Sequence, residues 1–454
     1  MSSVDAREIV FDMLLELHKS GMPSHLLLQR TLTKYQYLEK RDRAFISHLF
    51  KGVIARQITL DAVIGRHAKV KIGKMKPAVR ILLRMGSYQL LLMDHVPASA
   101  ACNETVRLAK RRGLSGLSGF INGVLRSIAR DSEEIRYPDA HEDPAGYLSV
   151  RYALPLWLVR RLLRTCDFET VARMGAYFLE DRQVTVRVRN AEKTEAISLE
   201  LIEAGITAEP GRLLPFALRL SGYDHLMAIP AFARGEMVAQ DESAMLPALA
   251  ADPHPGDRIL DVCAAPGGKS FQLADMLAAC GTGCVTARDL TETKTDRIRE
   301  NARRLGLGAI RVETRDAAVV CPEDIAAYDI VLADVPCSGL GVMGAKPDIR
   351  HNMTEEGIAS LRTLQRRILE TVQAYVKPGG LLIYSTCTVT PEENEDNVRW
   401  LTAHFPFETE SMAGILPERL PEEALRQGML QILPGQYGGD GFFVARLRRK
   451  ASAE

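Results

Sequence analysis

Several features that would assign this 454-residue chain to a class at once are missing from its sequence. Its eight cysteines are scattered, and none forms a CxxC pair, so neither a disulfide framework nor a zinc site of ordinary spacing is predicted. An apolar run at residues 81–93 is interrupted by Arg84 and Gln89, and it is shorter than the ~18 residues of a membrane span. Asp5 and Glu8 stand where a signal peptide carries basic residues. We expect a globular, cytoplasmic protein, with no membrane and no metal.

Net charge is also small, at +1, but it is unevenly distributed. Residues 1–130 carry 22 Lys and Arg against 9 Asp and Glu, which leaves about −12 for the rest of the chain. Between Arg66 and Arg84 there are seven basic residues and no acidic one. This asymmetry indicates a polyanionic partner, most simply nucleic acid. A solvated helix face is the alternative for any single run of charges.

The front of the chain is expected to be all-helical. Apolar residues recur every three to four positions in four segments, 9–17, 45–54, 79–91 and 116–130. Pro77 and Pro97 stand where helices would begin. Residues 1–135 are therefore predicted to form a compact helical bundle.

A segment rich in Glu, Asp, Pro and Gly, residues 131–146, predicts a linker before a second domain. Residues 156–179 hold two helical patterns, 182–190 alternate as a strand does, and 194–205 are amphipathic again. Residues 145–234 are thus expected to form a small α+β domain. On its strand, Arg182, Arg187 and Arg189 would either contact phosphate or face solvent.

Strands and helices alternate from residue 235 onward, which predicts a doubly wound parallel sheet in a domain ending near residue 449. The expected strands are 258–262, 285–289, 310–314, 330–334, 381–385 and 442–447. No internal repeat or low-complexity segment is evident.

Two of these strands end close to a cysteine. The strand at 330–334 stops at Asp334 and turns through Pro336 to Cys337, and the strand at 381–385 leads to Cys387. In open α/β sheets, ligands bind where such strands end. Thiol chemistry on a substrate is one interpretation, and the other is that Asp334 caps a turn and Cys337 is a small apolar filler.

A glycine turn follows the first expected strand, at residues 263–269. It matches neither G-x-G-x-x-G nor the phosphate-loop pattern, which argues against a nicotinamide or nucleoside triphosphate site. Asp289 ends the next strand, 21 residues past Gly268, where an acidic side chain accepts hydrogen bonds from ribose hydroxyls. Asp316, after the third strand, would face the same crevice near an adenine, or cap a turn.

A ribose-bearing cofactor beside two thiols, in a chain with a basic front, fits methyl transfer from S-adenosylmethionine to a pyrimidine carbon. C5 of cytosine is a poor nucleophile, but a thiolate added at C6 pushes electron density to C5, which can then take the methyl group. Asp334 is placed to assist this addition near N3 or the exocyclic amine, and Lys269 to hold Asp334 or assist proton transfer.

Five motifs occur together in the second half of the chain: Gln240-Asp-Glu-Ser243, Ala264-Ala-Pro-Gly-Gly-Lys269, Asp334-Val-Pro-Cys-Ser-Gly339, Lys346-Pro-Asp-Ile-Arg350, and Ser385-Thr-Cys-Thr388 with Pro391-Glu-Glu-Asn394. Together they resemble the RNA cytosine-C5 methyltransferase family over residues 236–447. The basic front resembles the NusB-like RNA-binding fold. The resemblance implies three parts: an all-α NusB-like bundle, a small α+β middle domain and an α/β Rossmann-like methyltransferase domain.

The resemblance also implies roles and partners. Cys387 would be the nucleophile, and Cys337 would help to release the enzyme from the methylated base. S-adenosylmethionine contacts are implied for Cys263, Ala264, Ala265, Pro266, Gly267, Gly268, Lys269, Asp289, Asp316 and Asp334. The expected substrate is 16S ribosomal RNA, free or in an early small-subunit particle, methylated by a monomer. Another ribosomal or transfer RNA cytosine, or a ribosome-assembly protein with a vestigial methyltransferase domain, is the alternative.

This chain departs from the family pattern in two places. Met343-Gly344-Ala345 stands where relatives often carry an aliphatic and two basic residues, so one or two RNA phosphate contacts are expected to be absent. Lys294 replaces the usual arginine after the second strand, a change that a surface position should tolerate.

Overall fold

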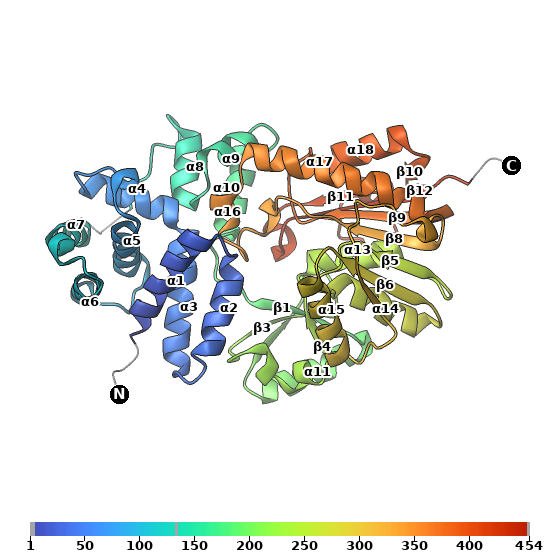
Figure 1. Ribbon diagram of the computed structural model, residues 1–454, viewed down its shortest axis with the longest axis horizontal. Coiled ribbons are helices and arrows are strands. Elements are labelled where there is room, and N and C mark those ends of the chain that lie inside the picture. Colours follow the sequence, from blue (N-terminus) through green and yellow to red (C-terminus); the bar gives the residue numbers. More distant parts are fainter. Residues whose placement is uncertain (1–4, 132–134, 452–454) are drawn as a thin grey trace. The chain divides into compact units, whose positions relative to one another are not determined.

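The computed structural model describes residues 5–131 and 135–451, which form two compact units (Figure 1). The helical unit contains the chain up to Glu180 together with Met343–Asn352, and the sheet unit contains Asp181–Val342 and the chain from Met353 onward. The boundary after residue 180 falls inside residues 145–234, which the sequence assigns to one domain. The three-domain division stays a prediction.

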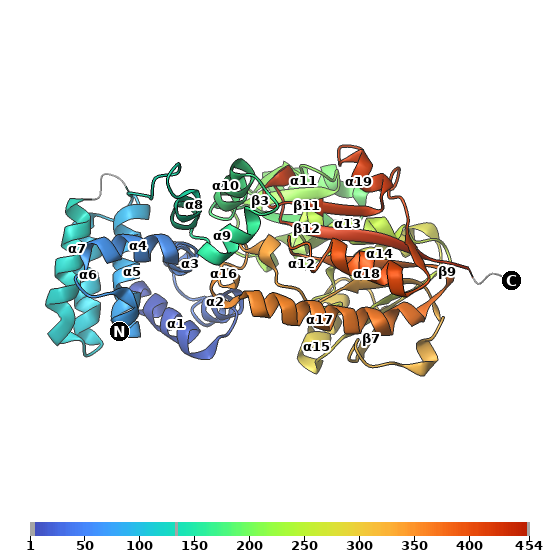
Figure 2. The same cartoon turned by 90° about the horizontal axis from the view of Figure 1, so that it is seen from above.

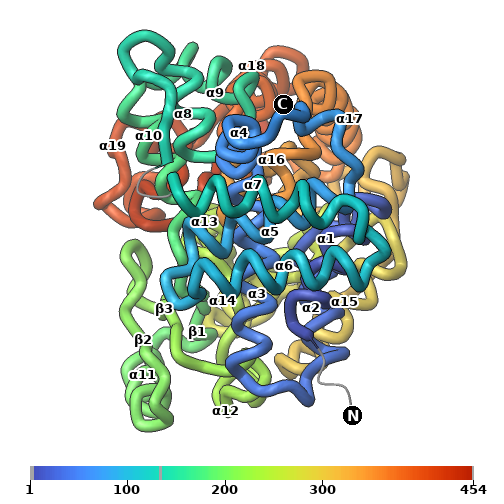
Figure 3. Tube along the Cα trace, turned by 90° about the vertical axis from the view of Figure 1, so that its left-hand side faces the viewer, coloured from blue at the N-terminus to red at the C-terminus, as the bar shows by residue number. Residues whose placement is uncertain are grey.

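The helical unit is built on a single apolar core. Its helices are α1 (Ala6–Ser20), α2 (Ser24–Lys34), α3 (Lys40–Ala55), α4 (Gln57–His67), α5 (Pro77–Leu92), α6 (Ala98–Arg111), α7 (Ser118–Arg130), α8 (Pro144–Tyr152), α9 (Leu156–Leu162), α10 (Phe168–Tyr177) and α16 (Ile349–Asn352). The four predicted helices are confirmed as α1, α3, α5 and α7. Helices α6 and α7, which lie side by side in Figure 3, pack on α5. The core contains Leu49, Leu82 and Leu125, none of them exposed.

One short segment from late in the chain, Met343–Asn352, is part of the helical unit. The side chain of Arg350 is buried and donates to the carbonyl oxygens of Ala55 (2.9 Å), Ala153 (3.3 Å) and Met343 (3.1 Å). His351 Nε2 lies 2.8 Å from the carbonyl oxygen of Ile54. Since these carbonyls belong to the C-terminal ends of α3 and α8 or to the segment itself, the guanidinium stands at the negative ends of two helices.

The sheet unit begins with a small antiparallel sheet in the order β2-β3-β1-β4. Its strands are β1 (Val184–Val188), β2 (Thr207–Pro210), β3 (Ala217–Ser221) and β4 (Met237–Ala239), with helices α11 (Thr194–Glu203) and α12 (Pro230–Ala233). The predicted strand and helix at 182–190 and 194–205 are confirmed as β1 and α11.

The three arginines in and beside β1 are paired with carboxylates, so they neither form a solvated face nor offer free guanidinium groups to phosphate. Arg187 and Arg189 both pair with Asp275, at 2.9 and 2.7 Å, and Arg182 pairs with Asp440 at 2.5 Å. Both sequence interpretations of these residues were wrong, because their carboxylate partners lie far along the chain. The three ion pairs connect β1 and its flanking residues with Asp275 in the helix at 268–280 and with Asp440 in the loop before residue 442.

The large sheet has the order β10-β12-β9-β8-β5-β6-β7, with β11 paired to β12. Figure 2 shows β11 beside β12. Its strands are β5 (Arg258–Asp261), β6 (Cys284–Asp289), β7 (Arg311–Thr314), β8 (Tyr328–Asp334), β9 (Val376–Thr386), β10 (Phe407–Thr409), β11 (Met429–Ile432) and β12 (Phe442–Arg449). Strands β5 to β9 are parallel, and β10 to β12 join antiparallel. All six predicted strands are confirmed, whereas β10 and β11 were missed.

Helices cover both faces of the large sheet. Helices α13 (Glu242–Ala251), α14 (Gly268–Cys280) and α15 (Glu292–Arg304) pack on one face, and α17 (Glu355–Val372) and α18 (Glu395–His404) on the other, with α19 (Glu422–Arg426) following (Figure 1). The predicted fold class is therefore confirmed: a helical front, a small sheet and an α/β sheet. In the part of the chain that the structure describes, no helix has the length and hydrophobicity to cross a membrane.

Candidate active site

The parallel strands bring four chain segments to one edge of the large sheet. Strands β5, β6 and β8 end at Asp261, Asp289 and Asp334, and β9 ends one residue before Cys387. Asp334 lies opposite Ser385 in the ladder of β8 and β9. Parallel strands turn into loops at the same edge, so the sequence-predicted residues of these loops meet there.

Asp334 and Lys269 form a pair at this edge. Lys269 Nζ donates to Asp334 Oδ2 at 2.6 Å, and Ser385 Oγ donates to Asp334 Oδ1 at 2.9 Å. Burial opposes the charged form of Lys269, but the Asp334 carboxylate outweighs it and the pKa of Lys269 is raised. The Lys269 ammonium also lies over the ring of Phe442, 5.1 Å from its centroid. The lysine is thus held as a cation beside an acid.

The two cysteines predicted at strand ends lie in contact. Cys337 Sγ is 3.3 Å from Cys387 Sγ. Their loops are also joined by the backbone, since Gly341 N donates to the Cys387 carbonyl at 3.0 Å, and a Cβ at Gly341 would come within 2.2 Å of the Gly441 oxygen. The hydrogen bond to Cys387 and burial together raise the pKa of the Cys337 thiol. The pair can therefore share a proton.

The glycine turn at residues 263–269 lies between β5 and α14. Ala264 N donates to the Arg288 carbonyl at 2.7 Å, and Ala265 N to Asp289 Oδ2 at 3.0 Å. Gly267 has φ of +112°, and a Cβ there would stand 2.1 Å from the Phe271 ring. Only glycine fits this turn, which leads the backbone directly into the N-terminus of α14. A strand-end carboxylate beside such a turn suits a ribose-bearing cofactor.

The two acids predicted to bind the cofactor differ in their surroundings. Asp289 is buried and accepts from Ala265 N, from Leu290 N at 2.7 Å and from Lys294 Nζ at 2.9 Å. Asp316 is exposed, and its carboxylate accepts from Ala318 N at 2.9 Å. The turn-capping interpretation of Asp316 is confirmed, while its contact with a cofactor stays a prediction. Lys294, one of the departures from the family pattern, is half exposed, and its ammonium group pairs with the Asp289 carboxylate.

Sequence reasoning missed a buried acid at the same edge. Asp261 accepts from Ser270 Oγ at 2.6 Å, and complete burial raises its pKa to about 7. Its position at the end of the first strand was the available signal. Among the described residues, no group of three or more His, Cys, Asp and Glu side chains could hold a metal ion.

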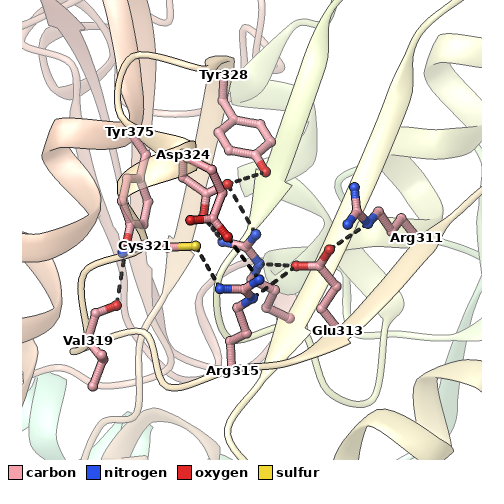
Figure 4. Close-up of polar contacts among 10 residues, drawn as sticks. Arg311, Glu313, Arg315, Val319, Cys321, Asp324, Tyr328 and Tyr375 are labelled. Atoms are coloured by element: carbon pink, nitrogen blue, oxygen red, sulfur yellow. Dashed lines mark hydrogen bonds and ion pairs between the residues drawn. The ribbon is translucent and has the colours of Figure 1, made fainter.

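A second set of charges supports the strand that carries Asp289. Arg288 pairs with Glu313 at 2.7 Å and also with Asp324, which accepts from Tyr328 OH at 3.0 Å. Figure 4 shows Glu313 and Asp324 among Arg311, Arg315 and Cys321. Arg288 points away from the glycine turn's partner Asp289, because successive side chains of a strand alternate. The network holds β6 and β7 in register.

Comparisons with known proteins agree with this geometry. Residues 248–448 match the family model described as 16S rRNA methyltransferase RsmB/F, and residues 4–130 match the NusB family. A relative from Bacillus subtilis (strain 168), described as a probable ribosomal RNA small subunit methyltransferase B, is 36% identical over 99% of this chain and 100% of its own. The chain belongs to the RsmB/F family of 16S rRNA methyltransferases.

Other members and structures extend the RsmB/F match. The ribosomal RNA small subunit methyltransferase B of Salmonella paratyphi A is 34% identical, over 91% of this chain and 92% of its own. A crystal structure of PH0851 has a TM-score of 0.80 and 25% identity, covering 98% of this chain and 99% of that one. RsmB/F membership makes the chain an S-adenosylmethionine-dependent rRNA methyltransferase with an RNA substrate.

Proposed function

We propose that this protein methylates C5 of a cytosine in 16S rRNA, cytosine 967, through a covalent adduct between Cys387 and C6 of the base. The target position follows from the resemblance of both the NusB-like front and the methyltransferase motifs to the enzyme that modifies that cytosine. The single observation that carries the chemistry is the Cys337–Cys387 contact of 3.3 Å, beside the Lys269–Asp334 pair.

The proposed reaction uses each of these side chains in turn. The Cys387 thiolate bonds to C6, and the 5,6 double bond of the base becomes a nucleophile at C5. The Lys269–Asp334 pair supplies a hydrogen bond and a proton near N3 and the exocyclic amine, where negative charge develops. S-adenosylmethionine, when bound, supplies the methyl group. A base then takes the C5 proton, the C5–C6 double bond re-forms, and the C6–S bond breaks.

Cys337 assists that last step. Its thiol lies within hydrogen-bonding distance of Cys387 Sγ and can donate to the sulfur as it leaves as a thiolate. The cofactor is assigned to the glycine turn, with its ribose toward Asp289, because that carboxylate stands at the end of β6 next to the turn. Asp316 keeps its proposed place near the adenine.

The RNA is proposed to lie on the basic front. Arg66, Lys69, Lys71, Lys74 and Lys76 are exposed, as phosphate contacts require. Arg84 is different, since its guanidinium donates twice to Asp61, at 2.7 Å each. We therefore remove Arg84 from the set of seven basic residues expected to meet RNA.

Substitution of the two cysteines tests the chemistry. Cys387→Ala should abolish methyl transfer and form no adduct, while Cys337→Ala should allow attack and trap the enzyme on RNA. The measurement is a denaturing gel of full-length enzyme with 16S rRNA and S-adenosylmethionine, with bisulfite sequencing at position 967. Near-normal turnover of Cys387→Ala, or an adduct without that cysteine, would contradict the assignment of roles to the two cysteines. Absence of methylation at position 967 by the unsubstituted protein would instead favour an RNA-binding assembly protein.

A further inference from the structure

Glu393 is a fully buried carboxylate next to the loops that carry the two cysteines. Its Oε1 accepts from Ser338 N and from Gln365 Nε2, both at 2.9 Å. Its Oε2 accepts from Ser338 Oγ at 2.5 Å and from Thr390 Oγ1 at 2.6 Å. Ser338 follows Cys337 directly, and Thr390 lies three residues after Cys387. One carboxylate therefore ties both thiol loops to helix α17.

The carboxylate itself is held in place by its surroundings. Asn397 Nδ2 donates to Gln365 Oε1 at 2.9 Å and to the Glu393 carbonyl at 3.2 Å, and Tyr384 OH donates to that same carbonyl. Gln365 Nε2 also donates to the Pro336 carbonyl at 2.9 Å. Because each of these donors comes from a buried side chain or from the thiol loop itself, Glu393 has little freedom to move.

No counter-ion neutralises this anion, since none of the ion pairs formed by residues 5–131 and 135–451 includes Glu393. Its negative charge acts on Cys337, whose pKa is raised first by the hydrogen bond to Cys387 and by burial, and also by Glu393. Beside Asp334, the charge interaction with Cys387 is one of the causes that raise the pKa of Lys269. The Glu393 anion thus acts on Cys337, and the Lys269 cation acts on Cys387.

We propose that Glu393 is a positioning residue that holds the Cys337 loop against the Cys387 loop and keeps their shared proton on Cys337, leaving the thiolate on Cys387. The proposal rests on the proposed function, in which Cys387 attacks the base. The proton stays on Cys337 Sγ and is donated as a hydrogen bond, so no net transfer is required. Among the described residues, the charged or titratable groups that act on the pair include Lys269, Asp334, Tyr384 and Glu393.

The test measures the reactivity of each cysteine separately in the full-length protein, without RNA or cofactor. Iodoacetamide modifies thiolates, so the rates at Cys387 and Cys337, followed by peptide mass spectrometry between pH 6 and 9, report where the proton lies. In the protein without substitutions we expect Cys387 to react with iodoacetamide at least about tenfold faster than Cys337. In Glu393→Gln we expect this preference to fall at least about fivefold, with Cys337 becoming reactive at lower pH, because the anion that favours its thiol is gone.

Two further variants separate charge from structure. Asp396→Asn makes the same charge change at a half-exposed position of α18, where Asp396 pairs with Arg399, and should leave the preference within twofold. Glu393→Asp keeps the charge on a shorter side chain, so it should keep the alkylation preference while kcat falls and KM stays constant.

A preference in Glu393→Gln within twofold of the unmodified sequence would overturn the proposal. If Glu393→Gln does not fold, Ser338→Ala tests the positioning role. This variant removes the hydroxyl that donates to Glu393 Oε2 and keeps the Glu393 charge. An unchanged kcat in Ser338→Ala would overturn the positioning role, and a fall of about tenfold with adduct accumulation would support it. Failure of the proposed function would appear instead as methyl transfer by Cys387→Ala. The alkylation rates are measured without RNA or cofactor, so they do not depend on that result.

Discussion

Arg350 in the helical unit and Glu393 in the sheet unit are both buried ions of opposite sign, and neither has a partner of opposite charge among the described residues. The cation is surrounded by backbone carbonyls at the ends of α3 and α8. The anion is surrounded by two hydroxyls, an amide side chain and one backbone N–H. Each ion is stabilised by dipoles that the fold has already oriented.

The comparison shows that oriented dipoles can replace a counter-ion, but with different consequences. Backbone carbonyls at a helix end cannot reverse, so a neutral replacement for Arg350 leaves them unpaired. Hydroxyls and amide groups can turn, so Glu393 is surrounded by more adaptable partners. We therefore expect the cation to matter more for stability and the anion more for chemistry. The chain's two tryptophans let each unit be followed alone, because Trp157 lies in α9 and Trp400 in α18.

The largest effect is expected for Arg350→Met. Because this change leaves three carbonyl oxygens, two of them in buried contacts, without their donor inside the helical unit, the free energy of unfolding of that unit should fall by about 3–5 kcal/mol. Urea denaturation of the Trp400→Phe background, followed by Trp157 fluorescence, measures it. Arg107→Met is the matched control, since the Arg107 side chain is 65% exposed and, within the described part of the chain, forms an ion pair with Glu104 alone. It should change stability by less than about 1 kcal/mol. Equal destabilisation of the two variants would show that burial of the Arg350 guanidinium among carbonyls does not stabilise the helical unit.

The next effect concerns pH. Burial, with Arg350 nearby, lowers the pKa of His351 to about 4, against 6.5 when unfolded. Between pH 6.5 and about 4, the unfolded chain therefore binds a proton at His351 that the folded chain does not bind. The stabilisation from neutral His351 is fully present above pH 6.5 and is lost as the pH falls to about 4. The loss amounts to about 3 kcal/mol in the helical unit.

His351→Gln should remove that part of the pH dependence while its amide still donates to the Ile54 carbonyl. The same Trp157 denaturation curves, taken at pH 7, 5.5 and 4.5, provide the measurement. If both proteins lose stability in parallel over this range, His351 is not the responsible group.

A third buried ion, Asp289, differs from Arg350 and Glu393 because it pairs with a cation, Lys294, whose side chain is 49% exposed. Asp289→Ala should weaken S-adenosylmethionine binding by about 1–3 kcal/mol, since a buried hydrogen-bonding partner is lost. Lys294→Gln should weaken it by less than about 1 kcal/mol, because an exposed ion pair contributes little. Titration calorimetry compares them, and a dissociation constant unchanged in Asp289→Ala would place the ribose elsewhere.

The smallest effect is expected for the salt dependence of RNA binding. It compares Lys74, for which no ion pair is described, with Arg84, which pairs with Asp61. Lys74→Gln should lower the dependence of log affinity for RNA on log salt by roughly 0.7–0.9. Arg84→Gln should leave that slope unchanged, because Asp61 already occupies the guanidinium. Filter binding at four salt concentrations measures the slopes. A reduced slope in Arg84→Gln would return that residue to the RNA-binding set.

Local patterns predicted the elements, while long-range contacts lay outside their reach. Strand β8 and its Asp334 could be located because apolar runs and turns are local signals. The short strands β10 and β11 carry too few residues for such a signal. Asp275, which pairs with Arg187, and Ala55, which accepts from Arg350, lie 88 and 295 residues away from these arginines, and no spacing reveals them. Glu393 stood inside a motif, but its role depends on four donors that only the folded chain assembles.

The position of Met343–Asn352 also sets an order in time. The helical unit lacks one part until residue 352 has been synthesised, about 170 residues after its first 180 are complete, which at ribosomal speeds is roughly 10–30 s. During that interval the carbonyl groups of Ala55 and Ala153, at the ends of α3 and α8, lack the Arg350 guanidinium that donates to them in the complete protein. Deleting residues 1–130 would remove α3 and leave Arg350 without a carbonyl partner there, so substitution of single lysines is the cleaner way to study the basic front.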